Sequence, residues 1–346
     1  DEVIKKRLLE KNDTGKDALQ LLYTSEVKAS LRNKINFSDG TISLKKYDTL
    51  KDFSEFYPMI PYQLDLLQQV FTKIRENSSA GKHFASGERN LLGAVQYAAL
   101  EYAEKDLGIL IPFQTFYGHL DQGLDHSVRA TIIKAQSTPT LQSFDVDVLK
   151  VLYLIRYLKS VPSTVENITT LMLDELDADR LKLTENITAA LDRLTKEYLV
   201  QRTGLEYLFL TNEEQDINRE INHMDIPTSK MQSYIGEMIY DTVLEMKKYK
   251  YVPFAEKKTV AYDFDCAKWI DESARGNATA EIGIHVVTPY SDDYRTREEL
   301  QQLSSRESRL VIALGDSGTF YDDTMMLLKI NEYLRSQSSK QNSGIK

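Results

Sequence analysis

The segment Phe56–Leu92, FYPMIPYQLDLLQQVFTKIRENSSAGKHFASGERNLL, predicts two helices joined by a loop. Pro58 and Pro61 fix the backbone before Tyr62 and prevent an earlier helix from running through. After them, apolar residues recur at three- and four-residue spacing, as they do on one face of a helix. These residues are Leu64, Leu67, Phe71 and Ile74.

Three cations lie around the expected start of the second helix. This helix should begin after Gly87 with Ser86 as its cap, and Arg89 then falls in its first turn, close to Lys82 and His83. A cation in a first turn opposes the helix dipole, whereas an anion there meets free backbone N–H groups. The pattern therefore indicates an anion-facing group. The alternative is that Arg89 bends away and pairs with a neighbouring carboxylate.

The same residues resemble the P-loop protein of BREX bacteriophage-exclusion systems, the BrxC/PglY family. The shared pattern is an aromatic–Pro–x–x–Pro–Tyr–Gln entry, a leucine-rich helix, then Gly81-Lys82-His83 and Gly87-Glu88-Arg89. The resemblance covers the whole chain, more weakly after residue 250. Proteins of this family are large AAA+-like ATPases that act with partner proteins in phage defence.

The resemblance implies several properties. The chain is far shorter than those proteins and starts at Asp1, so it is expected to be an internal or C-terminal fragment of one. It is expected to be cytoplasmic, to contact other BREX proteins and to associate with itself, while ATP and Mg²⁺ belong to the parent protein and not to this fragment. Arg89 would then lie in a helical lid beside the ATPase core, where lid arginines sense phosphate.

Composition sets wide bounds on the class of protein. The 346 residues are 42% apolar and 27% charged, which is ordinary for a soluble protein of two or three domains. The net charge of −9 argues against a molecule that binds nucleic acid over its whole surface. Cys266 is the single cysteine, so no intrachain disulfide forms. No apolar run approaches the length of a membrane span, so no membrane partner is expected.

The sequence predicts a mainly α, multidomain fold in three parts. Residues 1–137 read as a helical, lid-like region, and residues 138–225 as a winged-helix-like domain. Residues 226–346 read as a long helix from Pro227 to Tyr249, followed by a small α/β domain and a polar tail. The acidic segment Asn212–Asp225 is expected to link domains.

The winged-helix prediction rests on the order of its elements. Three helices are followed by LVQRTGLEYLFLT, which alternates around Thr203-Gly204 as a hairpin does. The third helix of such a domain often binds DNA, and Arg193 and Lys196 on it, with Arg202 in the hairpin, are the candidate contacts with DNA or a partner. However, residues 144–225 hold sixteen acidic and nine basic residues, a net charge of −7. We therefore favour a protein-contacting or interdomain role, with DNA contact as the alternative.

No catalytic set emerges from the motifs. Gly15-Lys16 fails as a phosphate-binding P-loop, because Glu10 replaces the first glycine and Asp17 follows the lysine where Ser or Thr would bind magnesium. Asp263 and Asp265 alternate along a predicted strand and face one side, so they could hold a metal. Solvated carboxylates are the favoured interpretation, and no metal site is expected.

These patterns favour a non-catalytic regulatory and assembly region of a BREX phage-defence ATPase. The assignment to BREX comes from the resemblance alone. The first alternative is a DNA-binding winged-helix loader or regulator. The second is a metal-dependent nuclease built on Asp263 and Asp265.

Overall fold

A computed structural model of the chain describes residues 2–38, 45–77, 87–121, 124–245, 248–251, 262–280, 282–292, 296–316 and 318–343, without the side chains of residues 87–89 and 338–343. The chain forms two compact units, Asp1–Arg219 and Glu220–Lys346. Most of the described elements are helices, which confirms the prediction of a mainly α, multidomain protein. In the part of the chain that the structure describes, no helix is both long and apolar enough to cross a membrane.

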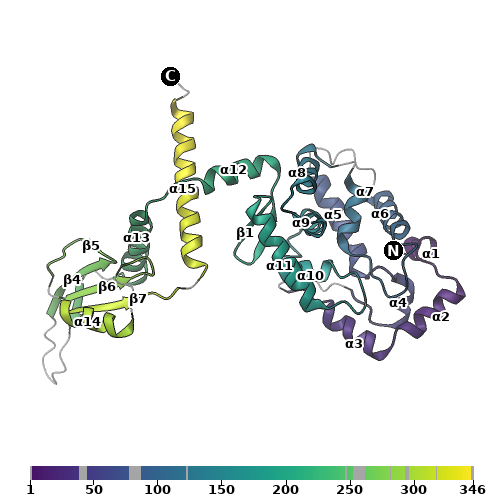
Figure 1. Cartoon of the computed structure of the whole chain (residues 1–346), viewed down its shortest axis with the longest axis horizontal. Coiled ribbons are helices and arrows are strands. Elements are labelled where there is room, and N and C mark those ends of the chain that lie inside the picture. Colours follow the sequence, from purple (N-terminus) through teal and green to yellow (C-terminus); the bar gives the residue numbers. More distant parts are fainter. Residues whose placement is uncertain are drawn as a thin grey trace. The chain divides into compact units, whose positions relative to one another are not determined.

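The first unit is helical apart from one hairpin (Figure 1). Its helices are α1 (Glu2–Arg7), α2 (Asp13–Leu22), α3 (Ser25–Lys34), α4 (Leu50–Phe56), α5 (Tyr62–Asn77), α6 (Gly87–Glu101), the 3₁₀ helix η2 (Phe113–Phe116), α7 (Tyr117–Leu120), α8 (His126–Ser137), α9 (Ser143–Ile155), α10 (Val165–Leu171), α11 (Arg180–Lys196) and the first part of α12 (Asn212–Asn222). The hairpin consists of β1 (Val200–Thr203) and β2 (Glu206–Phe209).

The two helices predicted from the opening segment are α5 and α6. α5 begins at Tyr62, directly after Pro61, and its predicted apolar residues are all buried. Gln63 fixes this start, because its amide nitrogen donates to the carbonyl of Ile111 at 2.7 Å and its oxygen accepts from the amide of Ile60 at 3.0 Å. α6 begins at Gly87, as expected, while Ser86 lies outside the described residues.

A single hydrophobic core extends through the first unit, from Ile4 to Phe209. The boundary expected between residues 137 and 138 therefore lies inside one compact body. Hydrogen bonds also cross it. Asn167 in α10 accepts from the amide of Ser38 at 2.9 Å, and the Thr170 hydroxyl donates to the carbonyl of Asn36 at 2.5 Å.

Residues 143–209 form three helices, α9, α10 and α11, followed by the hairpin β1–β2, which is the predicted order. Thr164 caps α10 by accepting from the amide of Asn167, and Gly204 takes a φ of 60° in the turn of the hairpin. A bridge pairs Thr164 with Glu206, so the segment before α10 lies against the second strand of the hairpin. The buried face of the third helix, α11, consists of Ile187, Ala190, Leu191 and Leu194.

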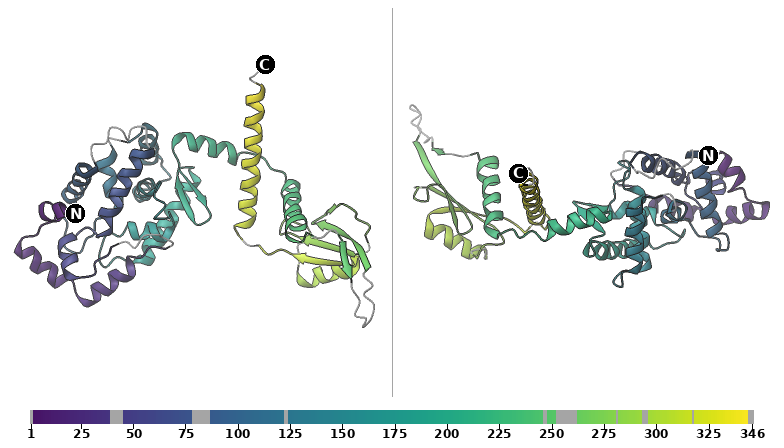
Figure 2. Two further views of the ribbon diagram at one scale, coloured as in Figure 1. Left: turned by 180° about the vertical axis from the view of Figure 1, so that it is seen from behind. Right: turned by 90° about the horizontal axis from the view of Figure 1, so that it is seen from above.

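The second unit contains a five-stranded sheet with helices on both sides (Figures 1 and 2). The strands β4, β6 and β7 run parallel, β3 pairs antiparallel with β4 at one edge, and β5 also pairs with β4. Ile270, Ile284 and Val286 of the sheet pack against residues of α13, η4 and α15. The bounds are α13 (Thr228–Glu237), the π-helix η4 (Met238–Val243), β3 (Lys248–Tyr251), β4 (Tyr262–Ile270), β5 (Ser273–Arg275), β6 (Ile282–Val287), α14 (Arg297–Glu307), β7 (Arg309–Ala313) and α15 (Phe320–Ser343).

The acidic segment expected to link domains forms α12 over most of its length, and the boundary between the two units falls within this helix. One detail of the sequence prediction is wrong. The helix expected to run to Tyr249 ends as η4 at Val243, whose side chain is exposed. Lys248–Tyr251 forms strand β3 because it pairs with β4, with Lys248 opposite Asp265.

Candidate functional site

The candidate anion site at the start of α6 lies largely outside the described residues. Lys82 and His83 lie outside the described residues. The backbone of Arg89 lies in the first turn of α6, as expected, but its side chain is not described. The anion-facing role of these three residues therefore stays a prediction.

Arg193, a candidate DNA contact on α11, is bonded to a carboxylate of the same unit. Its Nε donates to Oδ2 of Asp145 at 2.8 Å and its Nη2 donates to Oδ1 at 2.6 Å. Asp145 is fully buried in the first turn of α9, where it also accepts from the amide of Gln142 at 2.9 Å. These hydrogen bonds to Asp145 raise the pKa of Arg193, in spite of the opposing effect of burial. A forked guanidinium–carboxylate pair of this kind fixes α11 against α9.

Arg180, at the other end of α11, was not singled out from the sequence. Its guanidinium donates to the carbonyl of Lys34, to the Thr170 hydroxyl at 3.0 Å and to the carbonyl of Glu166 at 3.2 Å. It therefore ties α11 to the end of α3 and to α10. The partners lie up to 146 residues away in the sequence, so no local pattern indicates them.

The other two candidate contacts are exposed to solvent. Lys196 is in the last turn of α11, and Arg202 is in β1, where its Nε donates to the carbonyl of Gly204 at 3.1 Å. Lys182 is also exposed on α11, together with Glu185 and Asp192. The exposed charges of α11 thus balance, two lysines against two acids.

The two aspartates of the metal hypothesis lie on the exposed part of β4. Asp265 pairs with Lys248 of β3, its Oδ1 lying 3.3 Å from the lysine Nζ, and Asp263 lies opposite Lys250. Neither aspartate is buried. Across the residues that the structure describes, no group of three or more possible ligands comes together.

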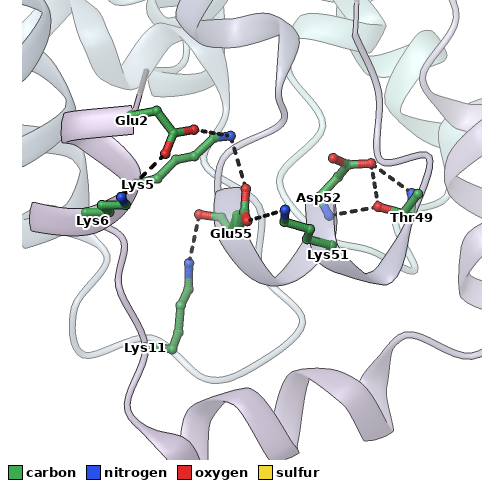
Figure 3. A network of polar contacts seen from close by, with 8 residues as sticks. All are labelled: Glu2, Lys5, Lys6, Lys11, Thr49, Lys51, Asp52 and Glu55. Atoms are coloured by element: carbon green, nitrogen blue, oxygen red, sulfur yellow. Dashed lines mark hydrogen bonds and ion pairs between the residues drawn. The ribbon is translucent and has the colours of Figure 1, made fainter.

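A polar network at the N-terminal end was not predicted from the sequence (Figure 3). Glu55 of α4 is its centre: its carboxylate lies 3.0 Å from the Lys5 ammonium and 3.7 Å from that of Lys51. Lys11, between α1 and α2, donates to the backbone carbonyl of Glu55, at 3.4 Å. Figure 3 shows the carboxylate of Glu55 directed to the two other lysines.

Lys11 and Lys5 differ in their electrostatic surroundings. Burial lowers the pKa of Lys11 to about 8, and only the charge of Glu55 opposes this effect. At Lys5 burial also disfavours the charged form, but Glu55 and Glu2 outweigh it and raise the pKa. A lysine with a lowered pKa beside a cavity is a candidate for a functional group.

Lys11 lines two neighbouring cavities. One has a volume of about 410 Å³ and a mostly apolar lining, which includes Leu8, Leu19, Tyr57 and Tyr102. The other, of about 170 Å³, lies between α1, α2 and α4 and is lined mainly by lysines and glutamates. The sequence around Lys11, Glu-Lys-Asn-Asp, carries no motif that would single it out.

A known family model matches the C-terminal part of the chain. Residues 224–346 match the family model described as "BREX ATP-binding protein BrxC 4th domain with six-stranded beta sheet". The match lies in the second unit, mostly in the region where the sequence resemblance is weaker, and it supports that resemblance independently. No solved structure matches the chain.

Proposed function

We propose that this BrxC-like chain is a non-catalytic regulatory and assembly region of a BREX phage-defence ATPase. Its residues 224–346 match the BrxC fourth domain. In this proposal the first unit makes interdomain, oligomer or partner contacts through a winged helix formed by residues 143–209. The partners are other BREX proteins and further copies of the same chain, in the cytoplasm.

The observation that carries this proposal is that both arginines of α11 form hydrogen bonds inside the first unit, so neither guanidinium is free to bind DNA. Arg193 is held by buried Asp145, and Arg180 donates to carbonyls of α3 and α10. A helix that reads DNA presents its cations to phosphates and bases, because phosphate contacts supply much of the affinity. α11 presents equal numbers of exposed lysines and acids, a surface better suited to a protein partner.

ATP and Mg²⁺ do not fit the one Gly-Lys candidate in the described residues. A P-loop needs free backbone amides between a strand and a helix. Gly15 lies in α2 after another helix, and its amide donates to Oδ1 of Asn12 at 2.8 Å as part of the helix cap. We therefore propose that ATP and Mg²⁺ bind in another part of the parent protein.

Both alternative functions keep some support. Lys196 and Arg202 are exposed, so weak, sequence-independent DNA binding through the winged helix remains the first alternative. A metal-dependent nuclease on Asp263 and Asp265 is weaker, because Lys248 already neutralises Asp265 and each aspartate faces a lysine across the ribbon.

Charge reversal on α11 in the full-length ATPase separates assembly from DNA binding. We expect Glu185→Lys with Asp192→Lys to lower recovery of BREX partner proteins and phage protection, while Lys182→Glu with Lys196→Glu has a small effect. Glu104→Lys, an exposed reversal elsewhere in the unit, is the control. If the lysine reversals alone abolish DNA binding and protection, and partner recovery is unchanged in every variant, the DNA-binding alternative replaces the proposal.

A further inference from the structure

We propose that the 410 Å³ cavity beside Lys11 binds a ligand with an apolar body and a single carboxylate, which the Lys11 ammonium holds. This inference does not depend on the proposed function. It rests on the pairing of Glu55, on the lining of the cavity and on the charges at its rim.

The first observation is an ammonium group that is partly buried without a carboxylate partner among the described residues. In the described parts of the chain no carboxylate oxygen comes within ion-pair distance of Lys11, and its one hydrogen bond, to the Glu55 carbonyl, is long at 3.4 Å. Glu55 is the nearby carboxylate that influences its pKa, but it is engaged with Lys5 and Lys51 (Figure 3). An ammonium has three donors, so Lys11 keeps hydrogen-bonding capacity for an anion.

The second observation is the cavity itself. Its volume is within the range of small-molecule sites, and most of its wall consists of aliphatic and aromatic side chains from α2, from α6 and from the segments that follow α1, α4 and α6. Tyr57 adds a hydroxyl, whose oxygen accepts from the amide of Gly108 at 2.8 Å. Burial raises the pKa of Tyr57, so this hydroxyl keeps its proton. A ligand in this space would bury an apolar body and meet a few fixed polar groups.

The charges around the cavity favour one negative charge over several. Glu10 and Asp106 line it as well as Lys11 and Lys105, so the formal charge of the lining is zero. A phosphate or nucleotide would bring two or more charges toward those two acids, whereas a carboxylate brings only one. The smaller cavity of 170 Å³ adds Lys5, Lys6 and Lys16, but also Glu2 and Glu55.

A carboxylate on an apolar body has two natural sources: the C-terminus of a polypeptide that ends in an apolar residue, and a free apolar acid. We use an acetylated pentapeptide that ends in phenylalanine for the first and 4-phenylbutyrate for the second. Each is compared with its amide, which keeps the shape and removes the charge. If the peptide binds more tightly than the free acid, a protein terminus is the ligand, and the reverse order indicates a small molecule.

Calorimetry on the full chain measures affinity, and NMR of the lysine side chains reports where the ligand binds. We expect at least one acid to bind about tenfold or more tightly than its amide, and the pKa of Lys11 to rise when it binds. Lys11→Met should remove the preference for the acid, whereas Lys16→Met, at a lysine that lines only the smaller cavity, should keep it. Equal binding of acid and amide, no binding of either acid at millimolar concentration, or an unchanged preference in Lys11→Met would each overturn the proposal.

Discussion

Arg193 and Asp145 form a two-pronged ion pair between α11 and the first turn of α9, across 48 residues of sequence. Asp145 is fully buried, while the side chain of Arg193 is 31% exposed. The arginine thus closes over a carboxylate that has no access to solvent. A residue that looks like a nucleic-acid contact in the sequence is therefore part of what holds the helices together.

Removal of Arg193 should destabilise the first unit. We expect Arg193→Met to lower the free energy of unfolding by about 2–3 kcal/mol, because the substitution leaves the Asp145 carboxylate buried without its partner. The loss is smaller than for a fully buried pair because the side chain of Arg193 is partly exposed. Lys196→Met, one turn further along α11, should change stability by less than about 0.5 kcal/mol. Denaturant unfolding followed by helical circular dichroism measures both variants.

The single tryptophan supplies an internal control for this measurement. Trp269 lies in β4 of the second unit, so its fluorescence reports unfolding of that unit. The fluorescence transition of Arg193→Met should match that of the unmodified protein. A variant as stable as the starting protein by circular dichroism would contradict the structural role of the pair.

DNA binding by the chain should be weak and should vanish at physiological salt. The reason is that the arginines of α11 are engaged and the exposed charges of the helix balance. A gel-shift titration at increasing salt checks this, with the double variant Lys196→Ala, Arg202→Ala as the measure of any winged-helix contribution. Nanomolar affinity at physiological salt, lost in the double variant, would favour the DNA-binding alternative.

Local signals in the sequence predicted most of the elements correctly. Pro61 indicated the start of α5, and the Thr203-Gly204 turn indicated the hairpin, because each signal acts within a few residues. The helical period after Pro227 predicted a longer helix than the structure has. Pairing of Lys248–Tyr251 with β4 outweighs that period, and such pairing depends on residues more than ten positions away.

The candidate sites were less predictable, because their chemistry depends on long-range partners. Arg193 and Lys196 look equivalent in the sequence, and only the fold distinguishes the ion-paired residue from the solvated one. Lys11 stands out only because Lys5 and Lys51, from two different helices, both engage Glu55. No spacing rule connects these residues.

Arg89 supplies a prediction for the parent ATPase. If it faces an anion in the parent, Arg89→Ala should leave the melting temperature of this chain nearly unchanged and lower ATPase activity or phage protection in the full-length protein. Thermal unfolding of the fragment and ATPase assays of the parent test the two halves. A loss of several degrees in the fragment, with full activity in the parent, would identify Arg89 as a structural residue.

Lys11 makes the stability of the first unit depend on pH in a defined window. Its pKa falls from 10.5 to about 8 on folding, so between these values the unfolded chain binds more protons than the folded one. Stability therefore rises with pH across this window, and the full penalty of the buried charge is present below it. Lys11→Met removes the penalty and should stabilise the unit by on the order of 1–3 kcal/mol at pH 7.

The difference in the free energy of unfolding between Lys11→Met and the starting protein gives the sharpest measurement. The advantage of Lys11→Met should be constant below about pH 7, shrink as the pH rises through 8, and disappear above 10.5, where Lys11 is neutral in both states. Lys16→Met, which removes an exposed lysine of the same region, should show no such trend. Because a bound carboxylate would stabilise charged Lys11, an acid that binds the cavity should reduce the advantage at pH 7. A gain in stability that does not vary between pH 7 and 10.5 would mean that folding does not lower the pKa of Lys11.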